Sequence, residues 1–295
     1  MKVKTYSLEF QEKLAGYGFL LPTTAVLAAV VVFPLLYSLL ASFYAYTFVT
    51  PGFNLFVGFE NYINALSDPY FWNSLVVTLS FVIAVVSIEF ILGFLIALML
   101  NRDIKFKGIY YTILTIPMLL SPVAVGLVWK MLLHPDLGIL NYFLSLLGIK
   151  GVNWLGTPKG AFWSVLFVDI WQQISFMILI LLAGLVSLPK EPYEASTIDG
   201  ANEWQKLLYI TIPLMKPVII VTLLIRTIFA FRTYDLIYVM TRGGPGVSTE
   251  VLSYFIYRKT FMGLNFAEAA ATSYILLIVV FILVFVMFRF IEGQR

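Results

Sequence analysis

Six long apolar runs constrain this sequence more than any other feature. They lie near Ala15 to Phe43, Trp72 to Leu100, Ile109 to Leu133, Ala161 to Leu188, Leu214 to Met240 and Ala267 to Phe290. Each exceeds the roughly 20 residues that an α-helix needs to cross about 30 Å of hydrocarbon. The first run is too long for a signal-peptide core and shows no small-residue cleavage site, so we expect it to be retained. The sequence predicts an all-α, polytopic membrane protein with six transmembrane helices and a single domain over residues 1–295.

The composition agrees with a membrane protein and excludes other classes. Hydrophobic residues make up 61% and charged residues only 12%, against roughly 25% charged in soluble domains. The net charge of +3, carried by scattered basic residues, indicates no nucleic-acid partner. Without cysteine there is no disulfide or thiolate chemistry, and the lone His134 is expected to be structural or incidental. With neither an HExxH motif nor a nucleophile paired with a base, we expect no enzyme, no metal and no cofactor on this chain.

The placement of Lys and Arg predicts the orientation, because basic residues are enriched in cytoplasmic segments. With the N-terminus inside, most of the 19 basic residues fall on the inner side: Lys2, Lys4, Lys13, Arg102, Lys105, Lys107, Lys190, Lys206, Lys216, Arg289 and Arg295. The outer segments hold only Lys150, Lys159, Arg242, Arg258 and Lys259. Both termini are therefore predicted to be cytoplasmic.

Several spans contain helix-breaking residues. They are Pro22 and Pro34 in the first run, Pro117, Pro122 and Gly126 in the third, and Pro217 in the fifth. These residues bend or interrupt the helical hydrogen bonds, either as ordinary kinks or as breaks that line a translocation path. After the third run, Leu137 to Leu147 is long enough for an interfacial helix but too short to cross.

The most polar interruption is the stretch from Glu194 to Pro213, between the fourth and fifth runs. Pro192 suits the first turn of a short helix, and Gly200 suits its end. Asn202 followed by Gln205 predicts a capping box that starts a second helix. We expect Pro213 to end this second helix, which gives a bent pair of short helices on the cytoplasmic side.

This stretch resembles the EAA motif, EAA-x3-G-x9-I-x-L-P, of permease subunits in binding-protein-dependent ABC importers. Its matching positions are Glu194, Ala195, Gly200, Ile210 and Pro213, while Ser196 and Ile212 replace alanine and leucine. Further likeness to the sugar branch of the family, the maltose-transporter type, lies in Val57 to Tyr62, Asp68 to Trp72, Ala183 to Pro189 and Tyr234 to Pro245. The resemblance implies an ABC importer type I permease fold, with residues 189–213 as the coupling loop and Asp199 beside Gly200 within it.

The resemblance also implies partners and a location. These are a second permease subunit, two ATPase subunits and an external solute-binding protein, in the cytoplasmic (inner) membrane. The chain has no GxxxxGK[ST] phosphate loop, so ATP and Mg²⁺ are expected on the partner ATPase. By resemblance, the short helix with Glu194 and Gly200 enters a groove on that ATPase and passes its movement to the spans.

Charged residues inside the runs form a second informative group, because a charge within a span usually faces a partner or a wet cavity. Glu89 and Arg226 lie about ten and twelve residues from the inner ends of their runs, a depth of roughly 15–18 Å at about 1.5 Å per residue. We expect them to form a buried ion pair between helices, and the alternative is that these charges form a polar wall along the solute route. Asp169 and Arg232 are placed together nearer the outer side, with Asp235 three residues beyond Arg232.

The expected substrate is a sugar or oligosaccharide, held by aromatic faces and hydrogen bonds. By resemblance, Phe229, Arg232, Thr233, Tyr234 and Asp235 line the pathway, and Trp171, Gln172 and Phe176 are further candidates. Arg232 leaves open an anionic solute such as a sugar phosphate or glycerol phosphate. The alternative class is an ion-coupled secondary transporter that uses Glu89 and Asp169 as ion sites. No pair of matching broken helices in the two halves favours that alternative.

Overall fold

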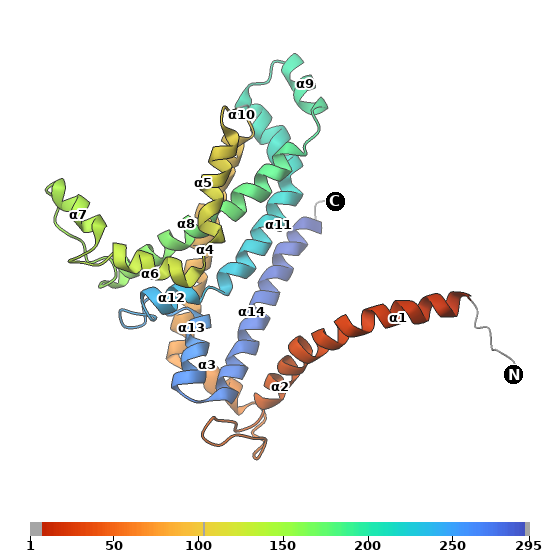
Figure 1. Ribbon diagram of the computed structural model, residues 1–295, viewed down its shortest axis with the longest axis vertical. Coiled ribbons are helices and arrows are strands. Elements are labelled where there is room, and N and C mark those ends of the chain that lie inside the picture. The colour runs from red at the N-terminus through yellow and green to blue at the C-terminus, as the bar shows by residue number, and fades with distance from the viewer. Residues whose placement is uncertain (1–7, 103, 293–295) are drawn as a thin grey trace. The chain divides into compact units, whose positions relative to one another are not determined.

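The computed structural model describes residues 8–102 and 104–292. Over those residues the chain consists of helices and loops with one isolated antiparallel bridge, between Tyr44 and Phe56, and the predicted all-α class is confirmed. The chain divides into two compact units. One holds residues up to 65 and 259–274, and the other holds residues 66–258 and those from 275 onward. Figure 1 shows the order of the helices.

The first unit contains the first predicted span. Helix α1 (Leu8–Leu27) passes through a π-helical turn, η1 (Ala28–Val32), into α2 (Phe33–Ala41). The stretch Gly16–Ala41 is long and apolar enough to cross a membrane. The widened π turn lies directly before Pro34, where the helix must accommodate a missing N–H.

A loop after α2 is fixed by one buried amide. Asn61, on α3 (Glu60–Ser67), donates from Nδ2 to the carbonyls of Ser42 (2.8 Å) and Tyr44 (3.0 Å). Further along the chain, η3 (Arg258–Met262) leads to the last helix, α14 (Phe266–Glu292). The Lys259 ammonium pairs with Glu268 at 2.5 Å and ties the end of η3 to the start of α14.

The second unit is built on two long helices, α4 (Pro69–Leu100) and α8 (Pro158–Val186), which pack against each other. Its other helices are α5 (Lys107–Leu119), α6 (Pro122–Leu132), α7 (Ile139–Leu146), α9 (Glu191–Ile198), α10 (Glu203–Lys206), η2 (Leu207–Thr211), α11 (Ile212–Phe231), α12 (Asp235–Met240) and α13 (Leu252–Tyr257). Gly93 permits the close packing of α4 on α8, because a Cβ there would come within 2.9 Å of the Met177 Cβ.

The third predicted span is a broken helix pair. Helices α5 and α6 are bent by 96° relative to each other, because Pro122 restricts the preceding Ser121 to extended backbone (ψ 130°). The carbonyl of Leu120, freed by this break, accepts a hydrogen bond from Gln172 Nε2 of α8 at 2.9 Å. The span predicted from Ile109 to Leu133 is therefore a single span only if α5 and α6 cross the membrane together as a bent pair. The described residues then hold five spans and a sixth, bent one.

The fifth predicted span also differs from expectation. Its helical region begins at Glu203, and α11 ends at Phe231, so residues 232–234 interrupt the predicted Leu214 to Met240 before α12 begins. The remaining spans, Pro69–Leu100, Pro158–Val186 and Phe266–Arg289, agree with the predicted runs to within about three residues at each end.

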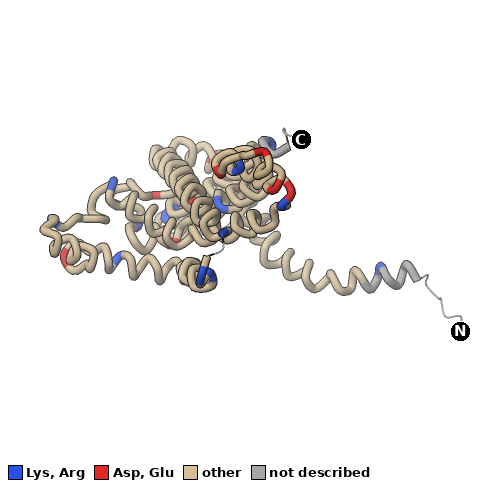
Figure 2. The backbone as a smooth tube through the Cα atoms, turned by 90° about the horizontal axis from the view of Figure 1, so that it is seen from above, with Lys and Arg blue, Asp and Glu red and all other residues tan. Residues whose placement is uncertain are grey.

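Charged residues are sparse along the chain, as the long tan stretches of the tube in Figure 2 show. Lys2, Lys4 and Arg295 lie outside the described residues, as do both termini, and the orientation stays a prediction. The short helix expected in Leu137 to Leu147 is present as α7. His134 is structural, since its Nδ1 accepts the backbone N–H groups of Asp136 (3.3 Å) and Leu137 (3.2 Å).

Candidate functional site: a two-helix loop and a buried charge cluster

The loop between α8 and α11 begins with the short helix α9. Pro192 occupies its first turn, where a missing N–H costs no helical hydrogen bond. Its C-terminal end is closed by two backbone hydrogen bonds, from Gly200 N–H to Thr197 O (3.2 Å) and from Ala201 N–H to Ser196 O (2.9 Å). This is the Schellman arrangement, and it requires the left-handed conformation that Gly200 adopts at φ +76°. The glycine at this position therefore sets where the chain turns.

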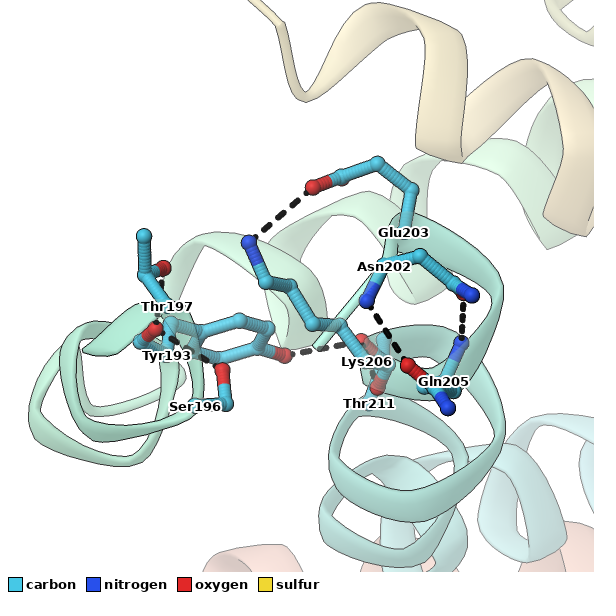
Figure 3. Close-up of polar contacts among 8 residues, drawn as sticks. All are labelled: Tyr193, Ser196, Thr197, Asn202, Glu203, Gln205, Lys206 and Thr211. Atoms are coloured by element: carbon cyan, nitrogen blue, oxygen red, sulfur yellow. Dashed lines mark hydrogen bonds and ion pairs between the residues drawn. The ribbon is translucent and has the colours of Figure 1, made fainter. Parts of the chain in front are cut away.

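The second helix of the loop starts at the predicted capping box. Asn202 Oδ1 accepts the Gln205 N–H at 2.9 Å, and Gln205 Oε1 accepts the Asn202 N–H at 2.8 Å (Figure 3). The same figure shows the Tyr193 hydroxyl of α9 against Thr211 Oγ1 of η2, 2.9 Å apart. This hydrogen bond links the two helices of the loop directly.

The expectation that Pro213 ends the second helix is wrong. Helix α10 continues through the π-helical turn η2 into α11, and Pro213 lies in the first turn of α11. The Ile212 N–H bonds to the Leu207 carbonyl, five residues back, so the widened turn comes directly before the proline and accommodates its missing N–H. The loop is thus joined to the span α11 without a break.

The exposed face of this loop carries most of the motif residues. Glu194, Ala195, Asp199, Gly200 and Pro213 are exposed. Ser196 and Ile210 are half-buried and border a shallow cavity beneath the turn at Gly200. The motif thus offers side chains for a partner to touch.

A buried charge cluster ties three spans together. The guanidinium of Arg226, on α11, contacts Glu89 of α4 from Nε (2.5 Å to Oε2) and from Nη2 (2.9 Å to Oε1). Its Nη2 also donates to the Asp169 carboxylate of α8. Arg226 is 1%, Glu89 0% and Asp169 3% exposed. One guanidinium therefore serves two carboxylates out of contact with water.

The structure brings together Glu89 and Arg226 but not Asp169 and Arg232. The expected placement of Asp169 beside Arg232 is wrong. Asp169 forms an ion pair with Arg226 instead, and Arg232 is exposed at the end of α11. A depth in residues assumes upright helices, whereas α4 has 32 and α8 has 29 residues, well above the roughly 20 needed to cross. Helices of that length tilt or protrude, so residue counts from opposite ends are not comparable.

The candidate pathway residues are spread over several environments. Phe229 and Phe176 meet edge to face, with ring centroids 5.7 Å apart. Trp171 packs instead against Trp129 of α6, at 5.5 Å. Gln172 is 1% exposed and is occupied with the Leu120 carbonyl, so in this conformation it supports the break between α5 and α6 rather than an open surface.

A tyrosine cluster beside the interruption of the fifth span was not foreseen. The ring centroid of Tyr234 lies 5.5 Å from that of Tyr238, 5.0 Å from that of Tyr257 and 6.2 Å from that of Tyr254. Burial, together with the Glu250 carboxylate, raises the pKa of Tyr254 and keeps its hydroxyl neutral. The spacing i, i+4 in 234/238 and i, i+3 in 254/257 was the available signal. Thr233 meets the same segment, since its carbonyl accepts the Ser253 hydroxyl at 2.6 Å.

Broken spans, an internal charge cluster and an exposed loop joined to a span define a membrane transport component. A family model described as binding-protein-dependent transport system inner membrane component matches residues 89–293, and the chain belongs to this family. Its predicted resemblance to ABC importer permeases is thereby confirmed, as is its place as a multi-pass protein of the inner membrane. Glu89 and Asp169, the ion sites of the alternative secondary transporter, are both bound to Arg226 in this structure.

Individual relatives cover most of the chain. It is 39% identical over 259 residues to the trehalose/maltose transport system permease protein MalF of Thermococcus litoralis, covering 88% of each. It is 34% identical to the sulfoquinovosyl glycerol transport system permease protein SmoG of Agrobacterium fabrum, with 90% of this chain and 86% of that one covered. Its fold resembles a chain in the crystal structure of a bacterial ABC transporter involved in the import of the acidic polysaccharide alginate, with a TM-score of 0.83, 24% identity and 96% of each chain covered.

Proposed function

We propose that this chain forms, with a second permease subunit, the membrane pathway of an ATP-driven importer for a sugar or oligosaccharide. An external binding protein delivers the solute. Two ATPase subunits hold ATP and Mg²⁺ and act on the loop at 189–213 from the cytoplasmic side. The chain itself carries no catalytic residue in this scheme. Relatives that are named as permeases for trehalose and maltose and for sulfoquinovosyl glycerol support the substrate class.

One observation carries the proposal: the exposed helix α9 is held by hydrogen bonds to a helical segment that runs into a span. The Schellman turn at Gly200 and the contact between Tyr193 and Thr211 fix α9 to η2, and η2 runs directly into α11. Two short helices with exposed motif residues, joined to a span through hydrogen bonds and continuous helix, are suited to receive a push from a partner. A freely solvated loop would need neither the cap nor the hydrogen bond.

The experiment replaces Gly200 by tryptophan in the assembled complex. An added Cβ at Gly200 meets nothing within 4 Å, so a side chain there begins in open space within this chain. The left-handed φ of +76° adds strain of about 1–2 kcal/mol. Gly148→Trp is the matched control, because Gly148 has φ +71° and equally open surroundings outside the loop. We expect Gly200→Trp to abolish solute-stimulated ATP hydrolysis and uptake, while Gly148→Trp keeps both. Normal coupling in an assembled Gly200→Trp complex would refute the proposal.

A second candidate, an importer of an anionic sugar derivative, is favoured by Arg232. Its side chain is exposed at the end of α11, beside the interruption at 232–234. A 35% identical relative over 242 residues, covering 81% of this chain and 82% of that one, is the sn-glycerol-3-phosphate transport system permease protein UgpA of Agrobacterium fabrum. Arg232→Gln should lower uptake of an anionic sugar about tenfold and leave a neutral disaccharide unchanged, with Arg242→Gln as control. If Arg232→Gln changed the uptake of both solutes equally, Arg232 would not recognise the anion, and the neutral sugar would be favoured.

A further inference from the structure

A groove in the second unit opens beside the proposed coupling loop, and the loop supplies about half of its lining residues. The groove has a volume of about 900 Å³ and lies between the C-terminal ends of α4 and α8, the start of α5 and the helices α10 and η2. Cavities that hold small ligands commonly have volumes of about 300–1,000 Å³. The groove is large enough for a headgroup with the first part of its acyl chains.

The polar rim of the groove is strongly basic. Its charged residues are Arg102, Lys107, Lys190, Lys206 and Glu203. Only one of them is acidic, and the Glu203 carboxylate is already paired with the Lys206 ammonium at 3.1 Å. Among the described residues that line the opening, three cations therefore remain in excess, which favours an anion with several oxygen acceptors, such as a phosphate.

The other wall of the groove is apolar and faces outward. Leu95 and Met99, one helical turn apart on α4, are 51% and 64% exposed, and Val186 at the end of α8 is 65% exposed. Leu95, Met99 and Val186 belong to the spans Pro69–Leu100 and Pro158–Val186, whereas Arg102 and Lys190 lie two and four residues beyond the ends of those spans. The cations thus lie at headgroup level and the apolar wall at acyl-chain level. Trp204, 72% exposed at the same rim, suits that interface.

We propose that this groove binds one anionic phospholipid. Its phosphate lies among Arg102, Lys107 and Lys190, and an acyl chain runs along Leu95 and Met99. A free phosphate would use the cations but leave the apolar wall exposed, which is why the lipid is the favoured source of the anion. The bound lipid bridges the end of α4 and the start of α9. The binding itself does not depend on the proposed transport cycle.

Native mass spectrometry of the assembled complex tests the proposal. The complex is incubated with palmitoyl-oleoyl phosphatidylglycerol or phosphatidylcholine, and retained lipid is counted. We expect phosphatidylglycerol to be retained at least tenfold better. Each basic residue near the surface contributes about 1 kcal/mol to anionic-lipid binding, or about fivefold. Arg102→Gln with Lys190→Gln should therefore lower retention about 25-fold. Lys150→Gln with Lys159→Gln, two exposed lysines away from the groove, should change nothing.

Two further arms separate the lipid from other occupants. Met99→Gln keeps every cation, so it should weaken phosphatidylglycerol retention several-fold if an acyl chain lies there. Millimolar inorganic phosphate should not displace the lipid. Equal retention of both lipids, insensitivity to Met99→Gln or displacement by phosphate would overturn the proposal. The proposal would also be overturned if a crosslinking residue introduced at position 99 reacted with an ATPase subunit and the complex retained no lipid. Thermal unfolding of each variant confirms that it is folded.

Discussion

The buried cluster of Glu89, Asp169 and Arg226 gives the sharpest test of the fold. Arg226→Met removes three hydrogen bonds to carboxylate oxygens and leaves two carboxylates without a cation. Both of these side chains belong to residues that are at most 3% exposed. Removing one partner of a buried ion pair costs about 3–5 kcal/mol. A loss of about 4 kcal/mol corresponds to a roughly thousandfold lower folded-to-unfolded ratio. The expected drop in unfolding temperature is on the order of 10 °C.

The cluster also determines which rescue works. Exchanging Glu89→Arg with Arg226→Glu restores a pair, but it sets the new carboxylate against Asp169, where two like charges repel. The exchange should therefore recover little stability by itself and much more when Asp169→Asn is added. Thermal unfolding of the purified chain in lipid nanodiscs, read by intrinsic fluorescence, measures all of these variants under one condition.

Two results would refute this reasoning. The first is an Arg226→Met protein that unfolds within about 2 °C of the unmodified chain, since no buried ion pair costs so little to break. The second is full rescue by the exchange without Asp169→Asn, which would exclude Asp169 from the cluster. Lys159→Met, at an exposed site, is the control for the loss of one positive charge and should leave the unfolding temperature unchanged.

Three further changes test local features. Asn202→Ala removes the capping box and should cost about 1 kcal/mol, seen as roughly fivefold faster hydrogen exchange at the start of α10. Gly93→Leu should separate α4 from α8 and lower the free energy of unfolding by about 1–3 kcal/mol or more, whereas Gly108→Leu, with nothing within 4 Å, should not. Gln172→Ala leaves the Leu120 carbonyl unpaired and should destabilise by about 1–3 kcal/mol, measured by thermal unfolding against Gln173→Ala.

The sequence contained the local chemistry of the loop almost completely. The capping box at Asn202 and the turn at Gly200 depend on neighbouring residues only, so pattern and structure agree. The course of the chain at Pro213 depends instead on a π-helical turn, which has no simple residue signature, and proline alone predicted an end that does not occur. The role of each proline is thus decided by the turn that precedes it.

Long-range placement was less predictable. The depth of Glu89 and Arg226 suggested a pair, and they are in contact, but the same counting misplaced Asp169 because long helices tilt. Gln172 read as a polar side chain lining a pathway, since nothing in the sequence shows that α5 and α6 break beside it and leave a carbonyl to satisfy. Contacts between spans depend on tilt and rotation, which a residue count does not contain.

The connection between the loop and the charge cluster suggests how movement crosses this unit. Helices α10, η2 and α11 form one unbroken path, and Arg226 lies 15 residues beyond Thr211, about 22 Å along it. Separating the Arg226 guanidinium from its two carboxylates inside a low-dielectric interior costs several kcal/mol, so α4, α8 and α11 move together at that level. The places able to give way are the π turn η2 and the interruption at residues 232–234. A push received by α9 is therefore expected to reach the far end of α11, where the exposed Arg232 lies.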